Sequence, residues 1–173
     1  MKALCKIFSL LMLFTLTFVS CSDDDDDKKE HHFDGSYTSK SEIYGNSNVA
    51  DLTINGDDIA INRMFPTYEG KFNKAKLAYN QAYMEVTGLN GKDVSLNDFT
   101  IIVNGKSFLV GIVNADAKFN NNDHIKFLDE TLGQIIKDQK LQVKIKFRPS
   151  KDIAATDNIK LNLHYAGTFY YMK

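Results

Sequence analysis

Tryptophan is absent from the 173-residue sequence, and cysteine and proline occur only twice each. Without tryptophan, the sequence lacks the largest aromatic side chain that a sugar-stacking surface could use. No apolar run approaches the roughly 20 residues that a membrane-spanning helix needs, which excludes such a helix from the body of the chain. The 21 basic and 22 acidic residues nearly cancel, and this balance does not favour nucleic acid as a partner.

Phenylalanine and tyrosine are plentiful instead, with 12 and 8 copies, and 43% of the residues are hydrophobic. This supply can build a core, which a disordered chain lacks. The length suits one globular domain and leaves too few residues for two ordinary ones. The composition therefore predicts a single folded domain.

Residues 1–20 have the organisation of a secretory signal peptide. Lys2 and Lys6 give a basic start, and the apolar run from residue 7 to residue 19 is too short to cross a bilayer. The segment ends in Phe18-Val19-Ser20-Cys21, which resembles the lipobox of bacterial lipoproteins. The resemblance implies cleavage before Cys21 and acylation of its thiol, although phenylalanine stands where leucine is commonest in the family.

The cysteine count favours acylation of Cys21 over the alternative, an ordinary cleaved signal peptide followed by an early cysteine. Cys5 is removed with the signal, so Cys21 would be an unpaired thiol in an exported protein. Each buried methylene of an acyl chain adds about 0.8 kcal/mol, and two or more chains anchor a protein stably. We therefore expect a membrane anchor of palmitate-type chains at Cys21.

An acidic run follows Cys21 directly. It consists of Ser22, Asp23, Asp24, Asp25, Asp26 and Asp27. Like charges in a row repel and nothing apolar is present to bury, so residues 21–32 are predicted to be a flexible tether for a domain at 33–173. The run resembles the signal by which some Gram-negative anaerobes export lipoproteins to the outer face of the outer membrane. The resemblance implies the cell surface; the alternative is a spacer on a protein that faces the periplasm.

The domain sequence alternates apolar and polar residues in short runs, which is typical of an all-β fold. One hairpin is predicted with strands at 50–54 and 59–61 around a turn at 55–58. A second has Asn104-Gly105 as a type I′ turn. Its register pairs Val103 with Lys106, Ile101 with Phe108, Ile102 with Ser107 and Phe99 with Val110.

The second half of the domain contains the clearest amphipathic strand, residues 140–148, and further strands at 159–165 and 169–171. One short helix is expected at 129–137, where apolar residues follow a helical spacing behind acidic ones. The count of eight or nine strands predicts an antiparallel sandwich or a small barrel.

No catalytic constellation is visible in the sequence. The domain lacks cysteine and a Gly-x-Ser-x-Gly elbow, and its two later histidines, His124 and His164, have no nucleophile at a diagnostic spacing. Gly105-Lys106-Ser107 lacks the upstream glycine of a phosphate-binding loop. We therefore expect a protein that is not an enzyme, without a cofactor and without a metal site; Asp116, Asn120, Asn122 and Asp123 do not match a calcium-binding loop.

Two surface features could contact a partner. Lys144, Lys146, Arg148 and Lys160 would form a basic contact face if their strands pair. Five tyrosines could stack on sugars, although packing in the sheet is their commoner role: Tyr79, Tyr83, Tyr165, Tyr170 and Tyr171.

Gly35-Ser36-Tyr37-Thr38 and Phe65-Pro66 resemble motifs of small all-β lipoproteins of the Bacteroides group, a family with no assigned activity. The lipoprotein signal together with the lack of a catalytic constellation predicts a lipid-anchored, non-catalytic outer-membrane protein that binds a protein or glycan partner. Gly35-Ser36-Tyr37 also resembles the Gly-x-Trp of lipocalins, with tyrosine in place of tryptophan. That resemblance implies the alternative, a calycin-type barrel that holds a small apolar ligand.

Overall fold

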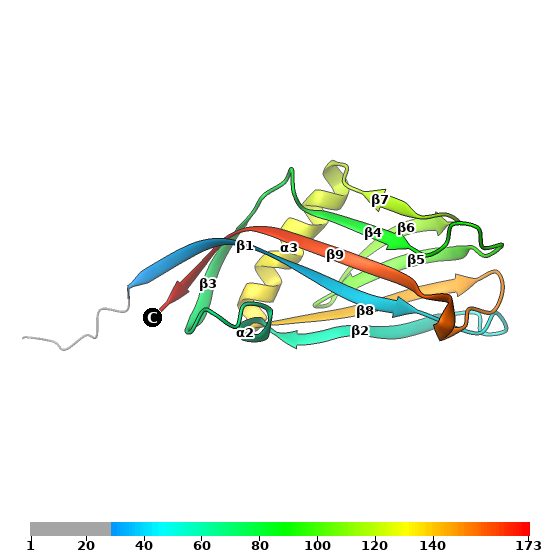
Figure 1. The fold of residues 1–173 in the computed structure, drawn as a ribbon, viewed down its shortest axis with the longest axis horizontal. Helices are drawn as coiled ribbons and strands as arrows, with labels where there is room; N and C mark the ends of the chain where they lie inside the picture. The colour runs from blue at the N-terminus through cyan, green and yellow to red at the C-terminus, as the bar shows by residue number, and fades with distance from the viewer. Residues whose placement is uncertain (1–28) are drawn as a thin grey trace, which may run out of the picture.

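The computed structural model describes residues 29–173, which fold into two antiparallel sheets packed face to face (Figure 1). The all-β prediction is confirmed. The five-stranded sheet contains β1 (Glu30–Ile43), β9 (Ile159–Met172), β3 (Lys71–Leu77), β4 (Tyr83–Thr87) and β7 (Ala117–Phe119). The four-stranded sheet has the order β2 (Leu52–Ala60), β8 (Lys140–Pro149), β5 (Leu96–Val103) and β6 (Lys106–Val113). No strand pairs across the two sheets in the described part of the chain, so the fold is a sandwich and not the closed barrel of the alternative.

The centre of the five-stranded sheet is β9, which forms one continuous strand where the sequence predicts two runs. On one side it pairs with β1 along its whole length, from Ile43 opposite Ile159 to Glu30 opposite Met172. On its other side β4 and β3 follow one another. The predicted start of the domain at residue 33 lies three residues inside β1, because His31 and His32 are already paired in the sheet.

The four-stranded sheet corrects one hairpin prediction and confirms the other. Residues 52–60 form the single strand β2, and the expected turn is only a bulge between Asn55 and Asp58 against β8. The Asn104-Gly105 turn joins β5 and β6, with both residues at positive φ as a type I′ turn requires. The predicted register holds from Val103 to Thr100; a bulge at Val110 then shifts Phe99 opposite Gly111.

Helix α3 (Asn122–Asp138) is longer than predicted and completes the core between the sheets. The expected start at residue 129 misses two turns, because the cap lies at Asn121, whose side chain accepts hydrogen bonds from the backbone of Asp123 and His124. The two remaining helical elements are short: α2 (Ile61–Met64) and a 3-10 turn (Ala155–Asp157).

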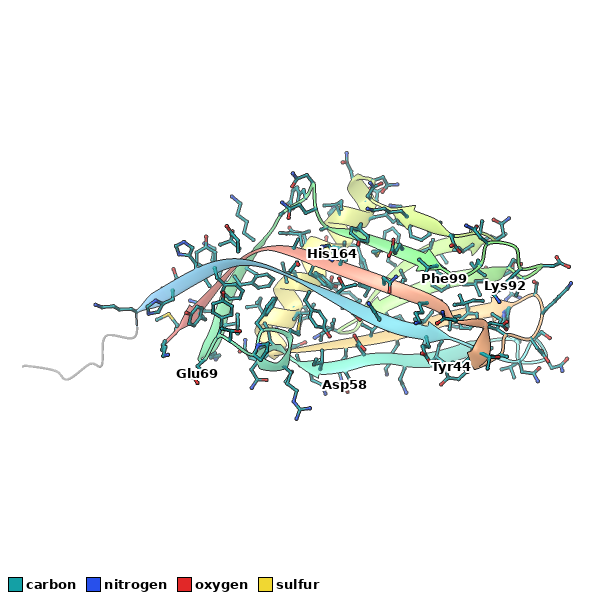
Figure 2. All side chains as sticks on the ribbon, in the orientation of Figure 1. Tyr44, Asp58, Glu69, Lys92, Phe99 and His164 are labelled. Atoms are coloured by element: carbon teal, nitrogen blue, oxygen red, sulfur yellow. The ribbon has the colours of Figure 1, made fainter. Side chains whose placement is uncertain are left out.

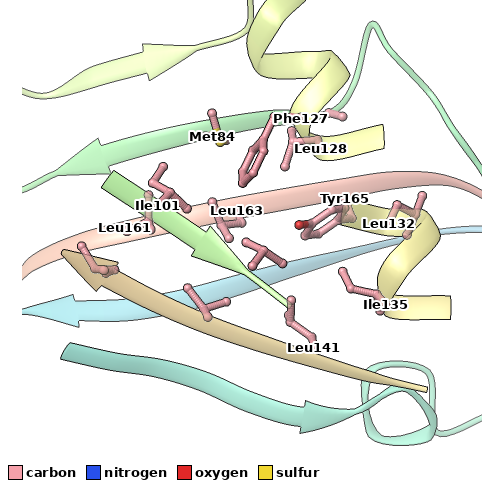
Figure 3. Close-up of a cluster of buried hydrophobic side chains, with 14 of the residues drawn as sticks. Met84, Ile101, Phe127, Leu128, Leu132, Ile135, Leu141, Leu161, Leu163 and Tyr165 are labelled. Carbon is pink, nitrogen blue, oxygen red and sulfur yellow. The ribbon is translucent and has the colours of Figure 1, made fainter. Parts of the chain in front are cut away.

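The core lies where α3 packs between the two sheets (Figure 3). Side chains from both sheets and from one face of the helix are fully or almost fully buried there: Met84, Leu161, Leu163, Tyr165, Ile101, Leu141, Leu128 and Leu132. The hydroxyl groups of Tyr165 and Thr131 lie 3.0 Å apart, so each buried oxygen has a partner. Burial holds the pKa of Tyr165 well above its ordinary value, against a smaller lowering effect of the hydrogen bond with Thr131.

Replacing Asn121 with alanine is expected to lower the free energy of unfolding by about 1 kcal/mol, because two backbone N–H groups at the start of α3 lose their acceptor. Urea denaturation of residues 29–173 measures this, since they contain every strand and helix described above. Asn122→Ala is the control, because Asn122 is exposed and its side chain has no hydrogen-bond partner in the described chain. Equal stability of the two variants would contradict the assigned cap.

Candidate functional site

The outer face of the five-stranded sheet carries polar side chains in rows across the strands, centred on β9. Antiparallel pairing places one outward residue of β1 beside each outward residue of β9 and, except at Ala166, one of β3 or β4 on the other side. His164 lies between Thr38 and Tyr83, and Tyr170 lies between His32 and Lys74. These two rows are about 20 Å apart along β9.

A hollow of about 550 Å³ opens between these two rows. Gly35 of β1 and Gly167 of β9, which are direct cross-strand partners, are among the residues that line it. A Cβ on Gly167 would lie 2.1 Å from the backbone oxygen of Lys76, so the close approach of β3 requires glycine. Beyond Leu77 the neighbouring strand ends, and the turn that leads to β4 forms one wall.

Polar groups of different chemistry surround the floor of the hollow. Thr168 donates a 2.6 Å hydrogen bond to the Asp34 carboxylate, which fixes both side chains across the strand pair. Ser36, Lys76 and Gln81 are exposed along the same rim and make no side-chain hydrogen bond or ion pair within the described chain. The hollow thus offers an ammonium group, an amide, a hydroxyl and one carboxylate to a ligand.

One side of the hollow is bordered by an ordered aromatic row. The His164 and Tyr83 rings stack with their centroids 4.8 Å apart, and Lys118 Nζ lies 3.8 Å from the Tyr83 ring centroid. His164 lies on β9 (Figure 2). Its Nδ1 lies 2.7 Å from the Thr38 hydroxyl. Burial and the nearby Lys118 lower the pKa of His164, against a smaller opposing effect of Glu85, so this imidazole is neutral at pH 7.

The other side is bordered by Tyr170. Its ring is flanked by His32 of β1, with centroids 5.7 Å apart, and by Lys74 Nζ at 5.1 Å from the ring centroid. Tyr170 therefore contacts neighbours from both adjacent strands, with its ring tilted against His32, and is half-exposed beside the hollow. A polar hollow between two aromatic rows is suited to a ligand with many hydroxyl groups, which can bond to the rim and contact the exposed parts of the rings.

The five tyrosines divide between the core, the outer face of the sheet and a loop. Tyr83 and Tyr170 are on the outer face, but Tyr165 is fully buried and Tyr171 points inward against Phe72 and Phe33. The exposed Tyr79 lies in a second, smaller hollow beside α3, where its hydroxyl donates a 3.2 Å hydrogen bond to Asp129.

Lys160 does not join the other residues of the predicted basic contact face. Lys144, Lys146 and Arg148 alternate outward along β8 of the four-stranded sheet, whereas Lys160 is on β9 of the other sheet. Acidic neighbours also offset two of these charges. Arg148 pairs with Asp98, and Lys146 Nζ lies 3.8 Å from Asp51.

His124 and Asp116 each contact neighbouring parts of the fold. The His124 ring packs against Phe108 and Phe119, and its Nδ1 is buried without a hydrogen-bond partner. Asp116 accepts backbone hydrogen bonds from Leu89 and Asn90 and so joins two loops. Among residues 29–173, no group of three or more His, Cys, Asp or Glu side chains is placed to hold a metal ion.

The environment of His124 predicts a pH dependence of stability. Burial lowers its pKa below the ordinary value of 6.5, with a weaker opposing effect of Asp123, and burial does the same for His164. The unfolded chain then binds more protons than the folded chain below about pH 6.5, so stability decreases as the pH falls from 7 to 5. The two histidines dominate this window, because the carboxylates with lowered pKa values titrate below it.

Urea denaturation at several pH values between 5 and 7 tests this prediction. His124→Phe keeps an aromatic ring between Phe108 and Phe119 and removes the titrating group, so its stability should depend less on pH than that of the wild type. Adding His164→Phe should flatten the dependence further. A wild-type stability that rises towards pH 5 would contradict the assigned environments.

The predicted anchor and export residues, Cys21 and Ser22 to Asp27, lie outside the described residues. Within the described chain, no helix has the length and apolar character to span a membrane. Comparisons with protein-family models, with curated proteins and with solved structures found no match.

The sequence prediction missed the hollow itself. Its rim residues Asp34, Lys76 and Thr168 are common surface types, and they come together only through the pairing of three strands that are distant in sequence. One local signal was available. Gly35 and Gly167 each interrupt an alternating strand, and an isolated glycine in a strand marks a close backbone approach.

Proposed function

We propose that this protein is a lipid-anchored, non-catalytic lipoprotein of the outer membrane, displayed at the cell surface, and that it binds a glycan in the hollow between Gly35 and Gly167. The lipobox at Cys21 and the acidic run from Ser22 to Asp27 support the location. The hollow supports the binding role.

The observation that carries the glycan assignment is the alternation of surfaces along β9. An aromatic row at His164, a hydroxyl-rich hollow at Thr168 and a second aromatic row at Tyr170 follow one another on one exposed face. Sugars present both hydroxyl groups and apolar ring faces, so they can use all three. A small apolar ligand would need an enclosed apolar cavity, whereas this hollow is open and rimmed by polar side chains.

The number of carboxylates that line the hollow favours binding of a glycan without hydrolysis. Glycoside hydrolysis with two carboxyl groups requires a pair about 5 to 10 Å apart across the scissile bond. Asp34 is the only carboxylate among the residues that line the hollow, and Thr168 already occupies one of its oxygens. The hollow therefore holds a ligand and leaves it unchanged.

The test is a glycan array with neutral and acidic oligosaccharides, probed with residues 29–173, followed by calorimetric titration of the glycans that bind. Lys76→Met and Thr168→Val each remove one polar group from the rim while keeping the side-chain volume. We expect each to weaken binding by about tenfold, the size expected for the loss of a hydrogen bond to a charged group.

Lys160→Met is the matched control, because Lys160 is outward on the same strand but lies at the other end of the face, opposite Thr87. We expect its binding to equal that of the wild type. Glycan binding that none of the rim variants weakens would contradict the assigned site. Absence of binding to every glycan would contradict the ligand class and direct the search to a protein partner.

A further inference from the structure

We propose that strand β6 is an interface through which two copies of this chain form a symmetric dimer, joining their four-stranded sheets edge to edge. This inference concerns the opposite sheet from the hollow and does not depend on the glycan assignment.

The two most exposed large apolar side chains of the described chain are both on β6. Leu109 is 66% exposed and Ile112 is 70% exposed, although the core of this protein otherwise takes in nearly all large apolar residues. β6 pairs with β5 on one side only, so the backbone N–H and C=O groups of its other edge have no strand partner within the described residues. Such an edge is a template for another strand.

The other edge strands carry more charged residues than β6 or are shorter. β2 carries Asp57 and Asp58 at a bulge, β1 has four charged side chains on its outer face, β3 has three lysines, and β7 has only three residues. In β6, the run from Ser107 to Val113 contains no charged residue. Charges and short lengths normally prevent edge pairing, and β6 has a single charged residue, Lys106 at its first position, so the rest of this edge is open to another strand.

The bulge at Val110 makes the strand complementary to itself. Because Thr100 pairs with Leu109 and Phe99 pairs with Gly111, Val110 is the extra residue, and Leu109 and Ile112 point to the same outer face. In an antiparallel pairing about a two-fold axis between Val110 and Gly111, Leu109 of one copy lies opposite Ile112 of the other. Residues on the outer face of β6 in one copy then lie opposite residues on the outer face of β6 in the other copy along the whole contact.

A second copy is therefore the occupant that fits best. Self-pairing brings no like charges together between Ser107 and Val113, and it covers all four exposed Leu109 and Ile112 side chains in one apolar cluster. The product is one eight-stranded sheet with β6 of each copy at its centre. The two-fold axis is perpendicular to this sheet, so the hollows of both copies remain exposed and face the same side.

Sedimentation of residues 29–173 over a wide concentration range tests the proposal, with two double variants that separate pairing from register. L109K/I112K places lysine opposite lysine across the axis and should weaken the dimer at least about tenfold. L109K/I112E places lysine opposite glutamate and should restore most of the association. Both sites are more than half exposed, so the monomer should keep its thermal stability.

Val49→Lys is the control, since Val49 is another exposed apolar residue, 45% exposed, but lies in the loop before β2. A wild-type protein that stays monomeric at every concentration would overturn the proposal. A dimer that tolerates L109K/I112K would place the interface elsewhere, and failure of L109K/I112E to restore association would overturn the proposed register.

Discussion

Replacing Gly167 with alanine is expected to destabilise the protein by about 1 to 3 kcal/mol, the usual cost of forcing an extra methyl group into a packed site. The new Cβ would lie 2.1 Å from the Lys76 carbonyl oxygen and 3.2 Å from Leu77 Cα. These are backbone atoms of β3, so rotation of a side chain cannot relieve the overlap. The backbone of β3 must therefore move away from β9. The same shift would widen the floor of the hollow and weaken glycan binding.

Gly133→Ala is the matched comparison and should change the stability in the opposite direction. Gly133 lies inside α3, and a Cβ there meets no atom within 4 Å. Alanine in a helix interior is more stable than glycine by about 0.5 to 1 kcal/mol. The unfolding temperature of Gly167→Ala should therefore lie below that of the wild type, and the unfolding temperature of Gly133→Ala should lie above it. A Gly167→Ala protein as stable as the wild type would contradict the close packing of β3 against β9.

The second large effect concerns the anchor. Changing Cys21 to alanine removes the thiol that we propose is acylated, so we expect the domain to leave the membrane fraction entirely. Each acyl chain contributes many methylene groups at about 0.8 kcal/mol each, and no apolar surface of comparable size replaces them in the tether. Fractionation of cells and immunoblotting of the membrane and soluble fractions measure this.

Asp23 to Asp27 provide the control for that experiment. Replacing all five with asparagine keeps Cys21, so the protein should remain in the membrane fraction and change only the face on which it is displayed. A Cys21→Ala protein that stays in the membrane fraction would contradict the lipid anchor. A membrane-bound asparagine variant still on the cell surface would contradict the export role of the acidic run.

The sequence predicted the features of the fold that depend on local pattern. Residues 140–148 alternate strictly, and they form β8. The Asn104-Gly105 turn was also correct, because the two residues that tolerate positive φ stand together between apolar runs. Each of these two signals is contained in a short stretch of consecutive residues.

Features that depend on tertiary contacts could not be predicted in the same way. Residues 55–58 are rich in turn formers, yet they form a bulge because β8 supplies partners on both sides of them. Helix α3 extends two turns earlier than its apolar spacing indicates, since Asn121 caps it and Ile125 and Phe127 are buried against the sheets. The hollow required the pairing of β1, β9 and β3, which no local pattern specifies.

The most direct test of the account is whether the hollow is exposed on the outside of the cell. The domain has no cysteine of its own, so Ser36→Cys places a single thiol on the rim. We expect a maleimide reagent that cannot cross membranes to label this variant on intact cells, and a Leu163→Cys variant, whose site is fully buried, to stay unlabelled. Labelling of Ser36→Cys only after the outer membrane is broken would contradict a surface-displayed binding protein.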